Sequence, residues 1–412
     1  MKILHLNYSD NIGGASKAAF RIHECLIKDG HESKMWVCNS DLNDPLIFSP
    51  KGFLFGINNK IRAKLSSFVC RGKIKKTGVY HSLSIFPSFW PKLINASDFD
   101  IVNLHWINGE MLSIKDISKI KKPIVWTLHD MWAFSGAEHL SYEEKWRDGY
   151  SKNKKGIFFW DLNRFVWKQK KRHWKKPMHI VSPSSWQSNC VGKSLLMSNW
   201  PRKVIPNCLD TEFWQDFDKN YARKLLQLPL DKPLLCFGTF DANNSFHKGV
   251  DLLNAALEKL KNRIPELEII LFGNEINNDA LCKKFTTHNL GFLKDELLMK
   301  AMYSASDVVA VPSRNESFGQ VASEAMACSR PVVCFDACGL KDIVDHKVNG
   351  YLAQSFDTED FANGIEWVVS NKKSKLLCLA ARNKVERLFS EKIIARQYLD
   401  FYKDAIGVAE SE

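Results

Sequence analysis

Two glutamates eight positions apart, Glu316 and Glu324, mark the stretch of this sequence with the clearest chemical potential. The β-branched apolar run Val308–Val311 predicts a buried strand, and apolar residues at three- and four-residue steps from Gln320 onward predict a helix. Glu316 is therefore expected in the turn between them, with Glu324 one turn into the helix. Both carboxylates could then face one pocket at the carboxyl end of a strand, where they would accept hydrogen bonds from hydroxyl groups.

The helix expected from Gln320 adds a second kind of chemistry. The first N–H groups of a helix and the positive end of its dipole form a ready site for phosphate. Carboxylates beside such a helix suit a ligand that carries both hydroxyls and phosphates, such as a nucleotide sugar. The alternative is a surface helix with two solvated acids, but the order of strand, polar turn and helix favours a binding site.

The extended motif resembles a known family. Pro312-Ser313, Glu316-Ser317-Phe318-Gly319, Glu324 and then Pro331-Val332-Val333 together resemble the Glu-x7-Glu region of retaining GT-B glycosyltransferases, the large family 4 type. The resemblance implies that Glu324 holds the ribose hydroxyls of the donor and that Glu316 holds its sugar. It also implies donor contacts for the rest of the turn, namely Ser317, Phe318, Gly319 and Gln320.

A glycine pair near the N-terminus lies at a similar junction. Lys2–Asn7 reads as a strand, Gly13-Gly14 opens a helix, and Glu32–Val37 reads as the next strand, which predicts a βαβ unit in a parallel sheet. Glycines there allow a close approach to phosphate or sugar, although the pair alone could simply form a tight turn. The resemblance implies that Gly13 and Gly14 border the donor diphosphate and sugar.

Two histidines follow predicted strands directly. Strand 100–104 leads to His105, and strand 123–128 leads to His129. A residue at the carboxyl edge of a parallel sheet faces the ligand crevice. The resemblance implies that His129 borders the donor sugar and the reacting centre. We expect a functional role for His129, whereas His105 could equally be a satisfied core histidine.

Lys248 has the setting of a phosphate-binding lysine. It precedes Gly249 at the start of a predicted helix that follows the strand Leu234–Gly238. Members of the family usually carry an arginine next to this lysine, but here His247 precedes it. This departure leaves open how strongly the diphosphate is bound and whether binding depends on pH.

The nucleobase is expected at two further strand ends. Residues 267–273 and 290–293 read as strands, and the resemblance implies that backbone groups there, including Phe292 and Leu293, contact the base. The side chains therefore do not indicate which base is bound.

The predicted fold is α/β, a GT-B arrangement of two Rossmann-like, doubly wound parallel-sheet domains facing a cleft. Residues 1–206 are expected to bind the acceptor, residues 207–389 to bind the nucleotide sugar, and a C-terminal helix within 390–412 to return to the first domain.

The composition is typical of a globular protein, and its positive charge favours anionic partners. Of 412 residues, 45% are hydrophobic and 25% charged, and the formal charge is +12. The charge would permit nucleic acid, but no basic-aromatic nucleic-acid motif is found. We expect no membrane span, no signal peptide, no disulfides and a cytoplasmic location.

Two basic stretches lie in the predicted first domain. Residues 51–79 form a basic amphipathic segment, and Trp160, Trp167 and Trp174 recur every seven residues among lysines. Either stretch could face an anionic membrane, but solvated or packed helix faces are at least as good an explanation. No cysteine lies between Cys70 and Cys190, so no metal site is expected in that region.

The predicted activity is the transfer of a hexosyl group from a nucleotide sugar to a glycan hydroxyl with retention at the anomeric carbon. His129, Glu316 and Lys248 are the expected catalytic residues, with no metal and no resident cofactor. The turn 129–134 looks most like family members of bacterial polysaccharide or O-antigen assembly, which suggests a lipid-linked acceptor at the inner membrane face. A non-catalytic nucleotide- or glycan-binding module and a nucleotide-sugar epimerase remain the alternatives.

Overall fold

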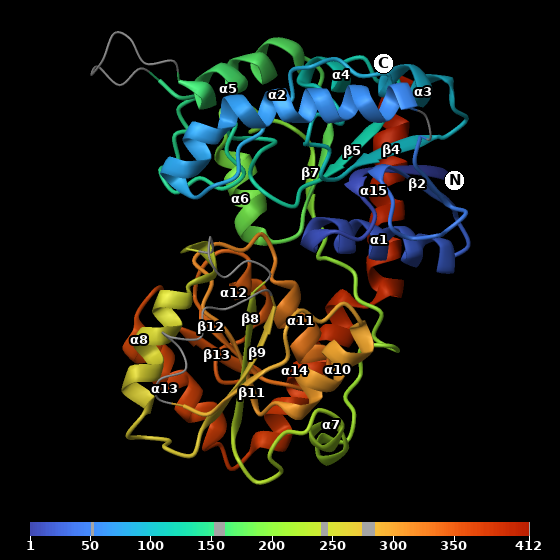
Figure 1. Ribbon diagram of the computed structural model, residues 1–412. Coiled ribbons are helices and arrows are strands. Elements are labelled where there is room, and N and C mark those ends of the chain that lie inside the picture. The colour runs from blue at the N-terminus through green and yellow to red at the C-terminus, as the bar shows by residue number, and fades with distance from the viewer. Residues whose placement is uncertain (51–52, 152–160, 240–245, 274–284, 412) are drawn as a thin grey trace. The chain divides into compact units, whose positions relative to one another are not determined.

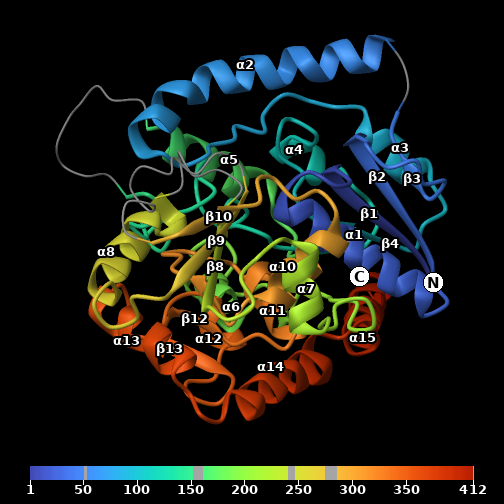
Figure 2. The ribbon, with the colours of Figure 1, turned by 60° about the horizontal axis from the view of Figure 1, so that its bottom comes forward.

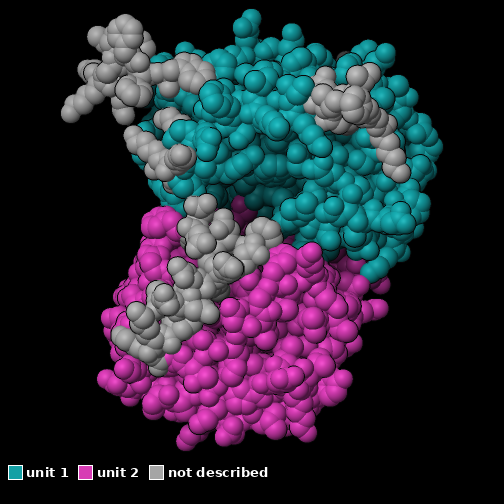
Figure 3. All heavy atoms as spheres, viewed as in Figure 1, with its two compact units in different colours: residues 1–206, 394–412 teal, residues 207–393 magenta. Residues whose placement is uncertain are grey.

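The computed structural model describes residues 1–50, 53–151, 161–239, 246–273 and 285–411. The chain forms two compact units, coloured separately in Figure 3. Unit 1 contains Met1–Pro206 and Ile394–Glu412, and unit 2 contains Asn207–Ile393. No helix in the described part of the chain is both long and apolar enough to cross a membrane.

Unit 1 contains a parallel sheet with the strand order β3-β2-β1-β4-β5-β6-β7. Figure 1 labels β2, β4, β5 and β7 of this sheet. Its strands are β1 Lys2–Ser9, β2 Glu32–Asn39, β3 Ile47–Phe48, β4 Ile101–Leu104, β5 Ile124–Thr127, β6 His179–Ser182 and β7 Arg202–Val204. Its helices are α1 Gly13–Lys28, α2 Phe53–Thr77, α3 Trp90–Ala96, α4 Ile114–Ile117, α5 Leu162–His173, α6 Ser185–Lys193 and most of α15 Glu391–Ser411.

The two faces of this sheet differ in chemistry. Alternate residues such as Leu4, Leu6 and Leu104 join the large apolar core of unit 1. The opposite face carries buried polar side chains, among them Asn103, whose amide donates to the hydroxyl of Tyr402 on α15 at 2.7 Å. The C-terminal helix is therefore fastened to the sheet by a specific hydrogen bond as well as by apolar packing.

Unit 2 contains a second parallel sheet, with the order β10-β9-β8-β11-β12-β13. Its strands are β8 Leu234–Thr239, β9 Glu268–Gly273, β10 Thr287–Asn289, β11 Val308–Val311, β12 Val332–Phe335 and β13 Gly350–Ala353. Its helices are α7 Lys219–Leu225, α8 Val250–Leu260, α10 Glu296–Ala305, α11 Gln320–Ala327, α12 Leu340–Ile343, α13 Thr358–Val369 and α14 Ser374–Phe389. Helices α10, α11 and α14 pack on one face of this sheet, and α8 and α13 pack on the other.

The predicted fold class is confirmed, since both units are doubly wound parallel sheets covered by helices on two faces. One strand was misplaced. The strand expected at 290–293 ends earlier, at Asn289, because the Asn289 side chain accepts from the N–H of Gly291 at 2.9 Å and Gly291 has a φ of 64°. Phe292 and Leu293 therefore follow a turn and do not belong to a strand.

The segment with the recurring tryptophans and lysines forms α5, one side of which packs into the core of unit 1. Trp160 lies outside the described residues, whereas Trp167 and Trp174 are buried. Lys170 of the same helix is also fully buried, and its ammonium group donates to the carbonyls of Trp132, Ser135 and Gly136. Three carbonyl acceptors replace the water that a buried ammonium loses. This lysine therefore holds the turn after β5 in place.

Candidate active site

The carboxyl edge of the unit 2 sheet brings Lys248 and Glu316 into contact. Lys248 precedes α8 and Glu316 follows β11, and the lysine Nζ lies 2.5 Å from the glutamate Oε1. The Ser313 hydroxyl donates to the same carboxylate oxygen at 3.0 Å. The side chains of Lys248 and Glu316 are 31% and 18% exposed, so both can reach a ligand. Two of the residues predicted for donor binding thus meet, although 68 positions separate them in the chain.

A second ion pair fixes the loop that carries Lys248. The Arg314 guanidinium contacts both carboxylate oxygens of Asp251 at 2.7 and 2.6 Å and donates to the Phe246 carbonyl at 2.8 Å. The hydrogen bonds from Arg314 also hold the pKa of Asp251 below its usual value. Gly249 allows the start of α8 to pack against the backbone of Pro312. Its φ is 70°, and a Cβ there would lie 1.9 Å from the Pro312 carbonyl oxygen.

Sequence reasoning missed Arg314 and Asp251. The sequence offers one signal for this pair, which is closeness to the motif residues. Arg314 lies two residues before Glu316, and Asp251 lies three residues after Lys248. An arginine is therefore present near Lys248, but it comes from position 314 and not from the position next to the lysine. Its charge is paired with Asp251.

Glu324 lies deeper than Glu316. It is buried on α11, and the Tyr303 hydroxyl donates to its Oε2 at 3.2 Å. Burial raises the pKa of the Tyr303 hydroxyl far above its usual value, and the neighbouring carboxylate adds to that effect, so this tyrosine remains a donor. A buried, tyrosine-bound carboxylate is a suitable fixed acceptor for a diol.

Three helices that begin beside the predicted donor residues have no N-cap side chain that accepts a hydrogen bond. This is true of α1, α8 and α11 in the described part of the chain, whose N-cap residues are Ile12, Gly249 and Gly319. Several other helices are capped by a serine or aspartate side chain, namely Ser113, Asp161, Ser184, Asp218, Asp295 and Asp357. An uncapped helix start leaves room for a ligand anion, but α3, α12 and α14 are uncapped as well, so the missing cap matters here only together with Lys248 and the two glutamates.

The remaining predicted donor contacts of unit 2 have mixed positions. Ser317, Gly319 and Gln320 lie at the start of α11, as the motif requires. Phe318 is buried with its ring against that of Phe389, so its side chain belongs to the core. Phe292 is 45% exposed beyond β10.

In unit 1, Gly13 and Gly14 form the start of α1. Gly13 has a φ of 85°, and a Cβ built at either glycine would meet no described atom within 4 Å. Asn7, at the end of β1, positions this helix start, because its amide donates to the Ser16 hydroxyl at 2.9 Å and accepts from the N–H of Trp106 at 2.8 Å. The open space beside both glycines is consistent with a ligand approaching the backbone there.

His129 ends a hydrogen-bonded series of histidines. Its Nε2 lies 3.0 Å from Nδ1 of His105, and Nε2 of His105 lies 2.9 Å from Nδ1 of His5. Burial lowers the pKa of His129 to about 4, although nearby Asp130 opposes this, so the ring is neutral at pH 7. His105 is thus a satisfied core histidine, but one in direct contact with the predicted functional residue.

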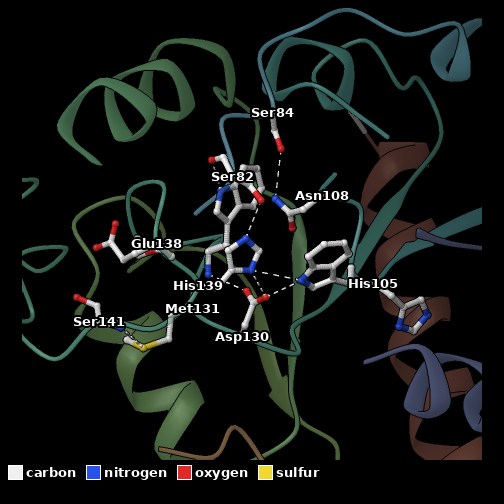
Figure 4. Close-up of polar contacts among 12 residues, drawn as sticks. Ser82, Ser84, His105, Asn108, Asp130, Met131, Glu138, His139 and Ser141 are labelled. Atoms are coloured by element: carbon white, nitrogen blue, oxygen red, sulfur yellow. Dashed lines mark hydrogen bonds and ion pairs between the residues drawn. The ribbon is translucent and has the colours of Figure 1, made fainter. Parts of the chain in front are cut away.

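Next to His129, Asp130 is held by a second network, drawn in Figure 4. Its Oδ2 lies 2.6 Å from Nδ1 of His139 and accepts from the Trp106 indole at 2.9 Å, while Nε2 of His139 lies 2.8 Å from the Ser82 hydroxyl. Burial alone would raise the pKa of Asp130, but the contact with His139 keeps it below its usual value.

The order of contacts in this network is that of a Ser-His-Asp triad, but the exposure is inverted. Ser82 and His139 are buried, whereas the Asp130 side chain is 20% exposed. The serine is therefore not placed as a nucleophile, and the network holds a carboxylate at the edge of the sheet. His139 and Ser82 could not be found from sequence spacing, because they come from separate loops.

Metal binding finds no support in the part of the chain that the structure describes, where no group of three or more histidine, cysteine, aspartate or glutamate side chains could hold an ion.

Comparison with known families agrees with this geometry. The family described as "Glycosyltransferase Family 4" matches residues 12–213, and "Glycosyl transferases group 1" matches residues 229–384. The chain belongs to the family 4 type of GT-B glycosyltransferases. The two matched regions contain His129 and the Lys248–Glu316 pair, respectively.

The matches to individual relatives cover only part of each chain. A D-inositol 3-phosphate glycosyltransferase of Xylanimonas cellulosilytica is 32% identical over 44% of this chain and 45% of its own length. An uncharacterised glycosyltransferase of Methanocaldococcus jannaschii is 30% identical over 56% of this chain and 64% of its own length. The chain thus spans less than two thirds of either relative.

A solved structure supports the fold. HepE of Anabaena, in complex with UDP and glucose, has a TM-score of 0.65 and 20% identity, with 98% of this chain and 100% of HepE covered. At that identity the similarity is one of fold.

Proposed function

We propose that this glycosyltransferase moves a hexosyl group from a nucleotide-sugar donor to a hydroxyl of a glycan acceptor, with retention at the anomeric carbon. The observation that carries the proposal is the contact of Lys248 with Glu316 beside the uncapped start of α11. A cation and a helix N-terminus suit a diphosphate, and the carboxylates of Glu316 and Glu324 suit sugar and ribose hydroxyls. HepE was solved with UDP and glucose, so UDP-sugars are the first donors to test.

In the proposed reaction Lys248 exchanges its contact with Glu316 for the donor diphosphate. Its charge then stabilises the negative charge that develops as the bond between the anomeric carbon and the phosphate oxygen breaks. The acceptor hydroxyl forms its bond to the anomeric carbon on the same face, and its proton passes to the leaving phosphate oxygen. Retention by this front-face route requires no protein nucleophile, no resident cofactor and no metal ion.

The test is incubation of the purified protein with a panel of nucleotide sugars and glycan acceptors, with and without chelator. Mass spectrometry would identify the product, and the anomeric proton coupling in NMR would give its configuration. We expect a retained linkage and activity that survives the chelator. Donor binding without turnover would indicate a binding module, and an isomerised free donor would indicate an epimerase.

We further propose that the acceptor is lipid-linked and is met at an anionic membrane surface through α2. Exposed apolar residues at helical spacing line one side of this helix, with Phe68 78% exposed. They are Ile61, Leu65, Phe68 and Val69, and the exposed basic residues Lys60, Lys64 and Arg71 lie on the adjoining stripe. Arg62, Ser66 and Cys70 form the buried side, so Arg62 does not belong to the basic surface. In Figures 1 and 2, α2 lies on the outside of unit 1.

Co-sedimentation with liposomes of graded anionic lipid content tests this surface. Each basic residue contributes about 1 kcal/mol near an anionic surface, so binding should be reversible and weakened by salt. Replacing Leu65 and Phe68 by serine should reduce binding. The matched control replaces Leu376 and Leu379, two exposed leucines of α14 in unit 2. Equal loss in both variants, or no binding with full activity on a soluble acceptor, would reject the membrane role.

A further inference from the structure

Three histidines at neighbouring strands of unit 1 form a continuous hydrogen-bonded series, in which His5 and His105 are buried and His129 is partly exposed. His5 lies in β1, His105 follows β4, and His129 follows β5, and these strands are adjacent in the sheet. The rings of His5 and His105 are stacked at 5.2 Å, and those of His105 and His129 at 5.3 Å. The series crosses the strands on the polar face of the sheet and ends at the edge where His129 lies.

Each contact in the series requires one ring nitrogen with a proton and one without, so the three tautomers depend on one another. If His105 Nδ1 donates to His129 Nε2, then His105 Nε2 has no proton and must accept from His5 Nδ1. The opposite direction requires protons on Nε2 of all three rings. Only these two arrangements satisfy both contacts with neutral rings.

The inner end of the series selects between them. Nε2 of His5 is buried and has no hydrogen-bond partner among the described residues. In the opposite arrangement this atom would carry a buried N–H without an acceptor, and such orphaned donors are rarer in proteins than unsatisfied acceptors. The arrangement with a proton on Nδ1 of every ring leaves an unsatisfied lone pair, and not an orphaned N–H, at the buried Nε2 of His5.

We propose that His5 and His105 are positioning residues that fix His129 as a neutral imidazole with its proton on Nδ1. His129 Nε2 is then occupied by the N–H of His105, so His129 acts as a hydrogen-bond donor through Nδ1 and not as a general base. The assignment of the proton rests on the structure of unit 1 alone. Its consequence for catalysis, donation to an oxygen of a bound sugar, rests on the proposed function.

The surroundings of the series favour the neutral form throughout. Burial lowers the pKa of His5 and of His105 well below the usual histidine range, and each is further lowered by neighbouring histidines. His23 of α1, whose ring lies 5.8 Å from that of His5, has a pKa lowered by burial to about 4. Asp130 faces His129 from the following position and does not restore its pKa to the usual range.

The direct test is long-range proton–nitrogen NMR of the whole protein labelled with 15N-histidine, with His129 assigned by the loss of its signals in a His129→Gln variant. We expect the shift of a protonated nitrogen at Nδ1 of His129 and of an unprotonated nitrogen at Nε2 at pH 7. A proton on Nε2, or on both nitrogens, would overturn the proposal. This readout needs no substrate, so it stands even if no transferase activity is found.

Variants of His105 connect the proton position to catalysis. His105→Phe removes the donor to His129, so the proton should move to Nε2 and kcat/KM should fall about tenfold. His105→Asn should restore both, because its side-chain amide lies near the place of the lost Nδ1–H. His179→Phe, a buried histidine of β6 outside the series, is the control and should leave the signals of His129 unchanged. If the proton stays on Nδ1 of His129 in a folded His105→Phe protein, the positioning role is wrong. If the wild-type protein transfers sugar normally with the proton on Nε2 of His129, this inference is wrong but the proposed function stands.

Discussion

The two units use the same architecture, but the edge of unit 2 carries two ion pairs, whereas unit 1 carries a series of neutral histidines. The edge of unit 2 has two ion pairs, Lys248 with Glu316 and Asp251 with Arg314, which join the start of α8 to the turn after β11. The polar face of the unit 1 sheet carries the neutral histidines His5, His105 and His129. The difference follows from burial, because these partly exposed side chains retain water for their charges, whereas the buried face of a sheet disfavours an imidazolium. Unit 2 can therefore exchange its charges with an anionic ligand, while unit 1 offers fixed hydrogen-bonding groups.

The comparison first predicts that acid weakens unit 1 more than unit 2. The folded pKa of His23 and of His129 is about 4, below the value of 6.5 for a solvated histidine. Stability from these groups is present above pH 6.5 and is lost as the pH falls toward 4, by roughly 3 kcal/mol for each fully shifted group. Glu138 opposes part of the loss, because burial raises its pKa to about 7.

Hydrogen exchange at pH 7 and pH 5 would locate this acid effect. Amides of β1, β4 and β5 should lose protection, whereas those of β8 and β11 should change little. Replacing His23 by leucine should reduce the pH dependence in unit 1. Equal loss in the two sheets would contradict the contrast between the units.

The second prediction concerns two glycines of unit 2 with positive φ, Gly249 at the start of α8 and Gly291 in the turn after β10. Gly249→Ala should destabilise unit 2 by about 3 kcal/mol or more, because the added Cβ would clash with the Pro312 carbonyl and φ is positive. Gly291→Ala, also at positive φ but in open space, should cost only about 1 kcal/mol. Denaturant unfolding measures both changes. Similar losses would mean that φ alone, and not the contact with Pro312, requires glycine at 249.

The local elements of this contrast could be predicted from sequence. The strand at Val308–Val311, the turn with Glu316 and the helix from Gln320 were all placed correctly, since each depends on its own run of residues. The sequence also indicates why no strand forms at 290–293, because Asn289 and Gly291 are residues typical of a turn.

The long-range contacts could not be predicted in the same way. Periodicity and spacing say nothing of which loop meets which, so Arg314 with Asp251 and His139 with Ser82 appear only in the structure. Lys170 departs from the rule that lysines are exposed, because three carbonyls from a distant turn surround it. The sequence does not decide whether His105 belongs to the core or to the site, and in the structure it is a buried residue that contacts His129.

The third prediction tests whether the unit 2 charges serve an anion. Lys248→Ala should weaken binding of a nucleoside diphosphate by about 1.5–3 kcal/mol and leave nucleoside binding nearly unchanged. The matched control is Lys259→Ala, because Lys259 of α8 is also paired with a glutamate, Glu359 of α13. This variant should affect the binding of neither ligand. Calorimetry with both ligands measures the difference. Equal losses for the two ligands would assign Lys248 to folding.

The smallest change sharpens the comparison on the side of unit 1. At Gly14 φ is not positive, and an added Cβ would meet no described atom within 4 Å, unlike the one at Gly249. Gly14→Ala should therefore leave the stability of unit 1 within about 1 kcal/mol of wild type, or raise it slightly, because alanine favours the helix. If the glycine pair exists to let a diphosphate or sugar approach the backbone, kcat/KM for the donor should nevertheless fall about tenfold. Ala15→Gly, one position further into α1, serves as the control for helix propensity and should lower stability without a comparable loss of kcat/KM. A stable Gly14→Ala protein with unchanged donor use would assign the pair to the turn alone, and the ligand would then contact unit 1 through its side chains and not through this backbone.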